Sequence, residues 1–337
     1  MSNGREQIRV DIRVPVGLPI PELVEFVRRC EEAGFHGVGI HDHHHSGRDA
    51  YVTLALAAAR TSQLVLYPAT TNTVTRHPLV LAALTNSLEE VAPGRVFLTV
   101  APGFLSVESA GRRRAPLNKL RQDVVIVRRL LAGDTVTSDG GPMRLNNKPE
   151  RPPPVLLTAS GPRMLELAGE VADGAMMLVG LHPDAVAAAR KRLRAGAERV
   201  GRDAEQLREI FIVPVAVGNR DSTREWPRRW FREGQPWLEY PSRSNLHWLR
   251  EADIDLPEGT DPSSITGELA DRICDAFGLF GEPEYCAERL IRAQEESGVE
   301  HVFLFPAHTL KTGYQVPETE VEVFGRVIGP RLTTRPR

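Results

Sequence analysis

Four histidines and one aspartate lie within five consecutive residues of this chain, in the run His41-Asp-His-His-His45. An imidazole changes its charge near neutral pH, so it is suited to move a proton during catalysis. Clustered imidazoles also bind transition metals, which is the alternative interpretation of the run. His301 and His308 stand isolated, and no carboxylate or histidine motif in a later segment completes a ligand set. We therefore predict proton-transfer chemistry here and no metal site.

A second candidate for chemistry is the turn Ser160-Gly161-Pro162, between a buried strand and a helix in the segment 155–178. Pro162 suits the first helical position, because the amide that it lacks would be unpaired there. Gly161 allows close backbone approach. Free amides and the positive end of the helix dipole then form a phosphate site at the end of the strand. An ordinary strand-to-helix turn with a helix cap is the alternative.

Composition limits the class of protein. With 337 residues, of which 41% are hydrophobic and 26% charged, the chain is long enough for one large α/β core. A net charge of -2 argues against nucleic-acid and membrane-surface partners, which select strongly basic proteins. Cys30, Cys274 and Cys286 lack metal-ligand spacing and are typical of reduced thiols. We find no signal peptide and no membrane-length apolar run, so we expect a cytoplasmic enzyme.

Apolar periodicity predicts eight strands that alternate with helices. The strands are expected at 8–14, 37–40, 64–68, 96–100, 211–217 and 301–305, with two more in the segment 155–178. Helices are expected at 21–34, 50–59, 78–91, 117–131, 183–200 and 284–296, with one more in that segment. This order indicates one (β/α)8 TIM barrel domain over 1–337, whose active site lies where the strands end. An open doubly wound sheet is the alternative, but the dinucleotide glycine pattern is missing after the first strand.

An insertion at 218–265 follows strand seven and interrupts the repeat. It contains all four tryptophans of the chain, Trp226, Trp230, Trp237 and Trp248. So long a segment in a compact barrel indicates either a lid or a subunit interface, and the sequence favours neither. A basic run, Arg112 to Arg114, is interpreted as solvated surface.

Several short motifs occur in a fixed order along these elements. They are Glu31-Glu-Ala-Gly-Phe35, Asp42-His43, Thr71-Asn-Thr-Val-Thr-Arg-His-Pro78, Pro93-Gly-Arg95, Ala101-Pro102-Gly103, Arg128-Arg-Leu-Leu-Ala-Gly133, Ser160-Gly-Pro162 and Ala172-Asp-Gly174. In this order the chain resembles the luciferase-like barrel family of flavin and deazaflavin oxidoreductases. It is most similar to the methylenetetrahydromethanopterin reductase branch, which uses coenzyme F420. The resemblance spans about 8–217 and resumes over 281–306.

The resemblance implies a (β/α)8 barrel with a tricyclic cofactor ring across its mouth. It implies a bulge in strand three, with a cis peptide at Ala69-Thr70. Asp42 would hydrogen-bond the cofactor, and His43 would face the substrate. The residues implied for cofactor binding are Asp42, Ala69, Thr70, Thr71, Asn72, Ala101, Gly103, Ala159, Ser160, Gly161 and Pro162. His43 and His44 are the candidates for supplying a compensating proton.

The chain departs from the family at two positions. Phe104 stands where related deazaflavin enzymes have a carboxylate after the glycine of strand four, and Ile12 matches a family glutamate in strand one. Both differences argue against methylenetetrahydromethanopterin as the substrate. The cofactor motifs remain, so the resemblance in fold extends further than the resemblance in substrate.

We therefore expect an F420-dependent oxidoreductase that transfers a hydride to or from a C=C, C=N or C=O group of a small molecule. The alternative within the family is an FMN-dependent monooxygenase, with Arg163 or Arg76 on the phosphate; their structural roles would be a surface helix residue and a capping partner. A non-catalytic cofactor-binding relative is the third hypothesis. The run Arg112 to Arg114 has one speculative role, attraction of the polyglutamate tail of F420. The family pattern and the insertion favour a homodimer.

Overall fold

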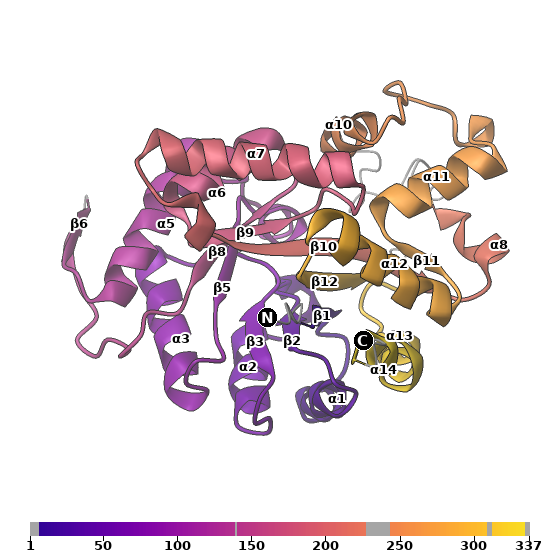
Figure 1. Ribbon diagram of the computed structural model, residues 1–337. Coiled ribbons are helices and arrows are strands. Elements are labelled where there is room, and N and C mark those ends of the chain that lie inside the picture. The colour runs from indigo at the N-terminus through magenta and orange to yellow at the C-terminus, as the bar shows by residue number, and fades with distance from the viewer. Residues whose placement is uncertain (1–6, 139, 227–242, 309–311, 334–337) are drawn as a thin grey trace, which may run out of the picture.

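A closed parallel barrel forms the centre of the molecule (Figure 1). The computed structural model describes residues 7–138, 140–226, 243–308 and 312–333. The sheet order is β3 (Val65–Pro68), β2 (Gly37–Ile40), β1 (Arg9–Val14), β12 (His301–Pro306), β10 (Arg208–Val217), β9 (Gly174–Met177), β8 (Val155–Ala159), β5 (Leu98–Ala101) and β4 (Thr71–Asn72). Because β3 and β4 are consecutive pieces of one strand, the two ends of this order meet. A bridge between Leu66 and Val96 completes the closure, so the predicted TIM barrel is confirmed.

Helices surround the barrel in the order that the periodicity predicts. They are α1 (Ile20–Glu32), α2 (Ala50–Ala58), α3 (Pro78–Val91), α5 (Leu117–Ala132), α6 (Pro162–Val171), α7 (Pro183–Arg199) and α12 (Pro283–Ser297). The predicted bounds of strands and helices agree with these to within about three residues. The described part of the chain contains no helix that is long and apolar enough to cross a membrane.

Two glycines bring α6 and α7 unusually close together. A Cβ atom at Gly169 would lie 2.0 Å from the carbonyl oxygen of Leu193, and one at Gly196 would lie 2.0 Å from that of Glu166. The two helices therefore pack backbone against backbone, which no residue with a side chain permits at these positions. This contact fixes α6, and with it the turn at its amino-terminal end.

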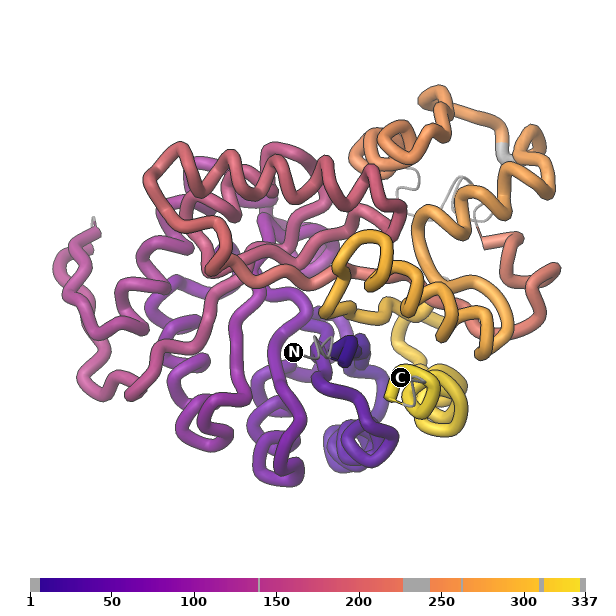
Figure 2. The backbone as a smooth tube through the Cα atoms, in the orientation of Figure 1, coloured from indigo at the N-terminus to yellow at the C-terminus, as the bar shows by residue number. Residues whose placement is uncertain are grey.

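The sequence analysis did not identify several elements outside the repeat. They are the short helix α4 (Leu105–Glu108), the hairpin β6 (Val136–Ser138) and β7 (Gly141–Met143), the strand β11 (Leu279–Gly281) beside β10, and the C-terminal α13 (Glu318–Val323), a π-helix at Phe324–Ile328 and α14 (Gly329–Thr333). The C-terminal segment packs beside α1, as Figure 2 shows in yellow and indigo. There the rings of Phe35 and Phe324 stack with centroids 4.0 Å apart.

The insertion after β10 contains α8 (Arg220–Thr223) and α10 (Arg243–Glu251), and is followed by α11 (Gly267–Phe277). These helices lie near the end of the barrel where β10 terminates (Figure 1). Trp248 is fully buried, and Trp226 packs against the main core. Trp230 and Trp237 of the predicted lid or interface lie outside the described residues.

The two faces of β1 belong to different cores. Ile12 is fully buried in the large core that the helices share with the sheet. Asp11 and Arg13 point the other way, into the barrel, where Asp11 meets the hydroxyl of Tyr67 and Arg13 lies over the ring of Phe305. Ile12, which the resemblance matches to a family glutamate, therefore points away from the barrel interior. The interior position near the mouth is that of Arg13.

Candidate active site

Asp42 is the centre of a polar group at the carboxyl ends of β2 and β4. Its side chain is 2% exposed, and its Oδ2 atom accepts hydrogen bonds from Thr71 Oγ1 at 2.7 Å and Arg76 Nη1 at 2.5 Å. Arg76 also binds Asp49 Oδ2 at 2.7 Å, and Asp49 caps α2. The Oδ1 atom of Asp42 is buried and has no hydrogen-bond partner among the described residues. One carboxylate oxygen is thus held in place and the other is left available for a ligand.

The interruption of strand three has the geometry that the resemblance implies, because the peptide bond Ala69-Thr70 is cis. Space for the bulge comes from Gly39 of β2, where a Cβ atom would lie 2.5 Å from the Cβ of Ala69. Inside the barrel, the hydroxyl of Thr70 accepts hydrogen bonds from Thr99 and Thr158, at 3.0 Å each. Strands β5 and β8 therefore support the bulge from within the barrel.

Asn72 and Gly103 shape the mouth through the backbone. The Oδ1 atom of Asn72 accepts hydrogen bonds from the amides of Val74 and Thr75, at 3.0 and 2.8 Å. The Oδ1 atom of this side chain thus holds the loop after β4 in place. Gly103 follows Ala101 at the end of β5 and has φ +88°, and a Cβ atom there would lie 2.1 Å from Val107. Only glycine satisfies both conditions.

His43 lies at the mouth, with its two ring nitrogens in different surroundings. The Nδ1 atom makes a short hydrogen bond with the hydroxyl of Tyr314, whereas the Nε2 atom is buried without a partner among the described residues. Burial, followed by the neighbouring His45, His44 and Arg13, lowers the pKa of His43 to about 4, although Asp42 acts in the opposite direction. This imidazole is therefore neutral at pH 7.

His44 is oriented differently from His43. Its Nε2 atom lies 3.1 Å from Thr75 Oγ1, and its Nδ1 atom lies 3.8 Å from Asp42 Oδ1. One nitrogen of His44 thus bonds Thr75 and the other faces Asp42 without a hydrogen bond. His43 differs in having its unpartnered nitrogen buried at the mouth.

The predicted phosphate turn lies at the end of β8 under the insertion. Ala159 ends the strand, Gly161 is the N-cap of α6 and Pro162 is its first residue, with no side chain capping the helix. The carbonyl of Ser160 accepts a hydrogen bond from Trp248 Nε1 at 2.7 Å, and a Cβ atom at Gly161 would lie 3.0 Å from the hydroxyl of Ser244. Helix α10 of the insertion is therefore in direct contact with the turn.

The next residues are the arginines that the sequence analysis considered for binding the FMN phosphate or the polyglutamate tail of F420. Arg76 is bound by Asp42 and Asp49, so it is not available to an FMN phosphate, and that suggestion was wrong. Arg163 is an exposed residue of α6. The run Arg112 to Arg114 is also exposed, as expected for a solvated surface. Its last member forms an ion pair with Glu108 at 2.9 Å and lies over the ring of Phe104.

Two residues of the site escaped the sequence analysis. The sequence analysis did not single out Arg13, although a charge alternating with apolar residues inside a strand signals an unusual barrel interior. Tyr314 comes from the C-terminal segment, where no motif marks it. It reaches the mouth because Gly17 lets the chain pass, since a Cβ atom at that position would lie 1.6 Å from the Tyr314 carbonyl oxygen.

A second polar group lies at the opposite, amino-terminal end of the barrel. Asp11 is fully buried and binds His36 Nδ1 at 2.9 Å, His301 Nε2 at 2.8 Å and the hydroxyl of Tyr67 at 2.7 Å. Our description of His301 as isolated was therefore wrong, because β1 and β12 are neighbouring strands. The three ligand atoms of Asp11, His36 and His301 lie close enough together to suit a metal ion, but each imidazole already hydrogen-bonds the carboxylate.

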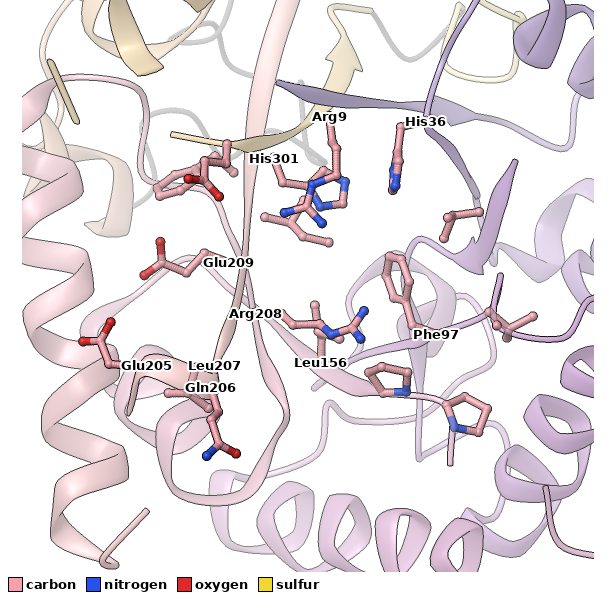
Figure 3. A pocket seen from close by; sticks show the side chains of 18 of the residues that line it. Arg9, His36, Phe97, Leu156, Glu205, Gln206, Leu207, Arg208, Glu209 and His301 are labelled. Carbon is pink, nitrogen blue, oxygen red and sulfur yellow. The ribbon is translucent and has the colours of Figure 1, made fainter. Parts of the chain in front are cut away.

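A cavity of about 780 Å³ opens beside this group (Figure 3). Arg9, His36 and His301 lie together on one part of its wall, and Phe97 and Leu156 of the barrel interior lie on another. Strand starts line this cavity, so it is remote from the Asp42 group at the strand ends. Its position does not match the usual location of active sites in barrels, and we assign the candidate site to the carboxyl ends.

The chain is similar to known enzymes over nearly its whole length. The model of the luciferase-like monooxygenase family matches residues 6–301. A 5,10-methylenetetrahydromethanopterin reductase of Methanolobus tindarius is 29% identical over 284 residues, covering 81% of this chain and 86% of the relative. An F420-dependent glucose-6-phosphate dehydrogenase of Nakamurella multipartita is 30% identical over 334 residues, covering 92% of each chain.

Solved structures show the same fold. The coenzyme F420-dependent tetrahydromethanopterin reductase of Methanopyrus kandleri superposes with a TM-score of 0.73 at 18% identity, covering 97% of this chain and 100% of the other. An F420-dependent secondary alcohol dehydrogenase, solved with an F420-acetone adduct, superposes with a TM-score of 0.70 at 18% identity, covering 97% and 99%. Since the family model spans most of the sequence, this protein belongs to the luciferase-like monooxygenase family.

Proposed function

We propose that this protein is a coenzyme F420-dependent oxidoreductase that acts on a small organic substrate. The proposal rests on the buried Asp42 beside the cis peptide at the strand ends. One of its carboxylate oxygens has no hydrogen-bond partner among the described residues. The names of the relatives support the same cofactor. When bound, F420 supplies or accepts a hydride at its carbon 5.

The residues present fit such a cofactor. The bulge at Ala69-Thr70 and the glycine at 103 would leave room for a flat ring at the mouth, and Asp42 Oδ1 would accept a hydrogen bond from it. The amides at Gly161 and the first turn of α6 would hold the phosphate. Helix α10, which touches this turn, would cover the phosphate and exclude water.

The neutral state of His43 favours one direction of reaction. A neutral imidazole is a base, so His43 Nε2 would take the proton of a substrate hydroxyl while the carbon that bears it loses a hydride and C–O becomes C=O. The hydroxyl of Tyr314 can donate or accept, so it would hold either tautomer of His43 through Nδ1. We propose oxidation of an alcohol as the favoured direction. In the reverse reaction the imidazolium formed at His43 would return its Nε2 proton to the carbonyl oxygen while the hydride returns to the carbon.

The remaining parts of the proposal concern the cellular location, the oligomeric state and the insertion. We infer a cytoplasmic enzyme that forms a homodimer, with the insertion 218–265 as the lid or the interface. The contact between Trp248 and Ser160 supports the lid, because it joins the insertion to the candidate phosphate turn.

The test is an anaerobic titration of the purified protein with oxidised F420 and, separately, with FMN, followed by fluorescence. We expect micromolar binding of F420 and at least tenfold weaker binding to Asp42→Asn, which keeps the shape of the side chain and removes its charge. Asp184→Asn is the matched control, because that carboxylate is 77% exposed. Selective binding of FMN would replace the proposal with an FMN-dependent monooxygenase. Absence of binding to either cofactor would favour the non-catalytic hypothesis.

A further inference from the structure

Arg13 is a buried cation inside the barrel, close to its carboxyl-terminal mouth. Its side chain comes from β1, and the residue is 3% exposed. The guanidinium Nη2 atom lies 3.1 Å from His41 Nδ1 and 3.1 Å from the carbonyl oxygen of Gly313, and the group lies over the ring of Phe305 at 5.0 Å. The Nε atom is buried and has no hydrogen-bond partner among the described residues. Within the described part of the chain, every contact of this cation is therefore with a group that carries no full negative charge.

The imidazoles around Arg13 supply no negative charge either. Burial, followed by Arg13 itself, lowers the pKa of His41 well below its usual value, and lowers that of His308 to about 3. Burial raises the pKa of Tyr314, so this phenol is protonated at pH 7. The described side chains that face Arg13 are thus neutral.

Two carboxylates line a small cavity with Arg13, but neither forms an ion pair with it. Glu318 is bound to Arg29 at 2.5 Å. Burial raises the pKa of Glu320, which favours its neutral form. Burial accordingly acts on Arg13 with no carboxylate to oppose it, and it lowers the pKa of this guanidinium to about 10, although Tyr314 acts in the opposite direction. At pH 7 it still carries its charge.

An unpaired buried charge is costly, and an anionic ligand beside it would offset that cost. A guanidinium presents a planar fork of donors that matches the two oxygens of a carboxylate or a phosphate. The ring of His41, which contacts Arg13, stacks on that of His43 with centroids 5.2 Å apart. The cation and the imidazole proposed to move the proton thus face the same small region of the mouth.

We propose that Arg13 binds an oxyanionic group of the substrate, so that the substrate class is a small hydroxy compound that carries a carboxylate or a phosphate. This inference rests on the proposed function and deepens it. Arg13 holds the anion while the substrate hydroxyl lies at His43, so the anion orients the carbon that loses the hydride. Neutral alcohols of the same size lack this anchor and are poor substrates.

Anion binding is measured on the F420-loaded protein with sodium acetate and with inorganic phosphate as separate probes. Ionic strength is held constant with sodium chloride, and the fluorescence of bound F420 is the readout. Arg13→Met, which keeps a stem of similar shape, is compared with wild type and with Arg60→Met at an exposed position. We expect saturable binding of at least one probe to wild type, with a loss of tenfold or more in Arg13→Met, which is about 1.4 kcal/mol. We expect the affinity of Arg13→Met for F420 to stay within about twofold of the wild-type affinity.

The melting temperature distinguishes ligand binding from a purely structural role of Arg13. If the charge is held for a ligand, the melting temperature of Arg13→Met without ligand equals or exceeds that of wild type. Arg13→Lys is the second variant, since it keeps the charge and loses the fork, and it should retain part of the anion affinity. A lower melting temperature in Arg13→Met together with unchanged anion affinity would overturn the proposal.

Other outcomes separate this proposal from the proposed function. If wild type binds F420 but shows no saturable response to either anion, Arg13 is not an anion site and the oxidoreductase proposal stands. If Arg13→Met loses tenfold in F420 affinity, Arg13 serves the cofactor and the inference is wrong. If wild type does not bind F420, the proposed function fails, and thermal shifts of the cofactor-free protein with both anions still test Arg13. Where wild type does bind F420, comparison of lactate with 2-propanol as substrates tests whether the anion raises kcat/KM.

Discussion

Replacement of Asp11 by asparagine tests how the amino-terminal end of the barrel is stabilised. Asp11 is a fully buried carboxylate that accepts hydrogen bonds from His301, His36 and Tyr67. Burial alone would raise its pKa, but the charges and hydrogen bonds of His301 and then His36 outweigh burial and lower it. Asparagine has one acceptor oxygen and replaces the other with a donor, so at least one of these partners loses its acceptor.

The expected cost is large because one member of a buried charged network is removed. Such changes cost about 3–5 kcal/mol of unfolding free energy. The pKa of Asp11 is lower in the folded protein than in the unfolded chain, so its ionised form stabilises the fold at pH values above the ordinary carboxyl pKa of about 3.9. That stability is lost as the pH falls toward the lowered native value. The difference between wild type and Asp11→Asn is therefore full at pH 7 and narrows below about pH 4.

Urea unfolding followed by tryptophan fluorescence at pH 7 and at about pH 3 measures this difference. Asp184→Asn, at an exposed carboxylate, is the control and should change the free energy by less than about 0.5 kcal/mol. A loss below about 1 kcal/mol at pH 7 would refute the network as a source of stability. Addition of EDTA to wild type distinguishes the alternative metal site: we expect no change in stability, and a fall to the level of Asp11→Asn would show that a metal holds the three residues together.

Three further predictions concern the helix contact, the insertion and the proton-transfer residue. Gly169→Ala forces a Cβ atom against the carbonyl of Leu193, so urea unfolding should show a loss of about 1–3 kcal/mol, whereas Gly140→Ala, which meets nothing within 4 Å, should be neutral. Trp248→Phe leaves the Ser160 carbonyl without its donor at a cost of about 1–3 kcal/mol, and F420 titration should show weaker binding; unchanged affinity would contradict the proposed cover over the phosphate turn. His43→Asn should lower kcat by a factor of about 10²–10⁴ with little change in F420 affinity. The kcat/KM of the wild type should be flat above about pH 5 and fall toward pH 4, because protonation of His43 removes the catalytic base.

Apolar periodicity predicted the barrel because each strand and each helix is long enough to show its own period. The bounds of β2 and α3 were predicted without error, since glycine or proline marks their starts. The break between Pro68 and Thr71 was not visible in the periodicity and came from the resemblance. The C-terminal helices were missed, because a short segment such as Glu318–Val323 carries too few residues for a period.

The candidate site was predicted in part, and the difference has a physical reason. Motif residues such as Asp42 and Thr71 lie next to strands, and the barrel brings them within 2.7 Å of each other. Asn72 also lies there, and its Oδ1 atom is taken up by neighbouring amides, whereas its Nδ2 group makes one long hydrogen bond to Ser106 at 3.4 Å. Tyr314 meets His43 across 271 positions of sequence, a distance at which no spacing argument applies.

The contrast between Asp11 and Arg13 shows how pairing distinguishes structure from function. The two residues are neighbours on the same face of β1, and both are buried inside the barrel. Asp11, toward the amino-terminal end, has three hydrogen-bond donors around its carboxylate, which explains its charge without a ligand. Arg13, toward the mouth, has no described carboxylate as a partner. Since both charges are costly to bury, the paired one stabilises the fold, and the unpaired one indicates where an anion binds.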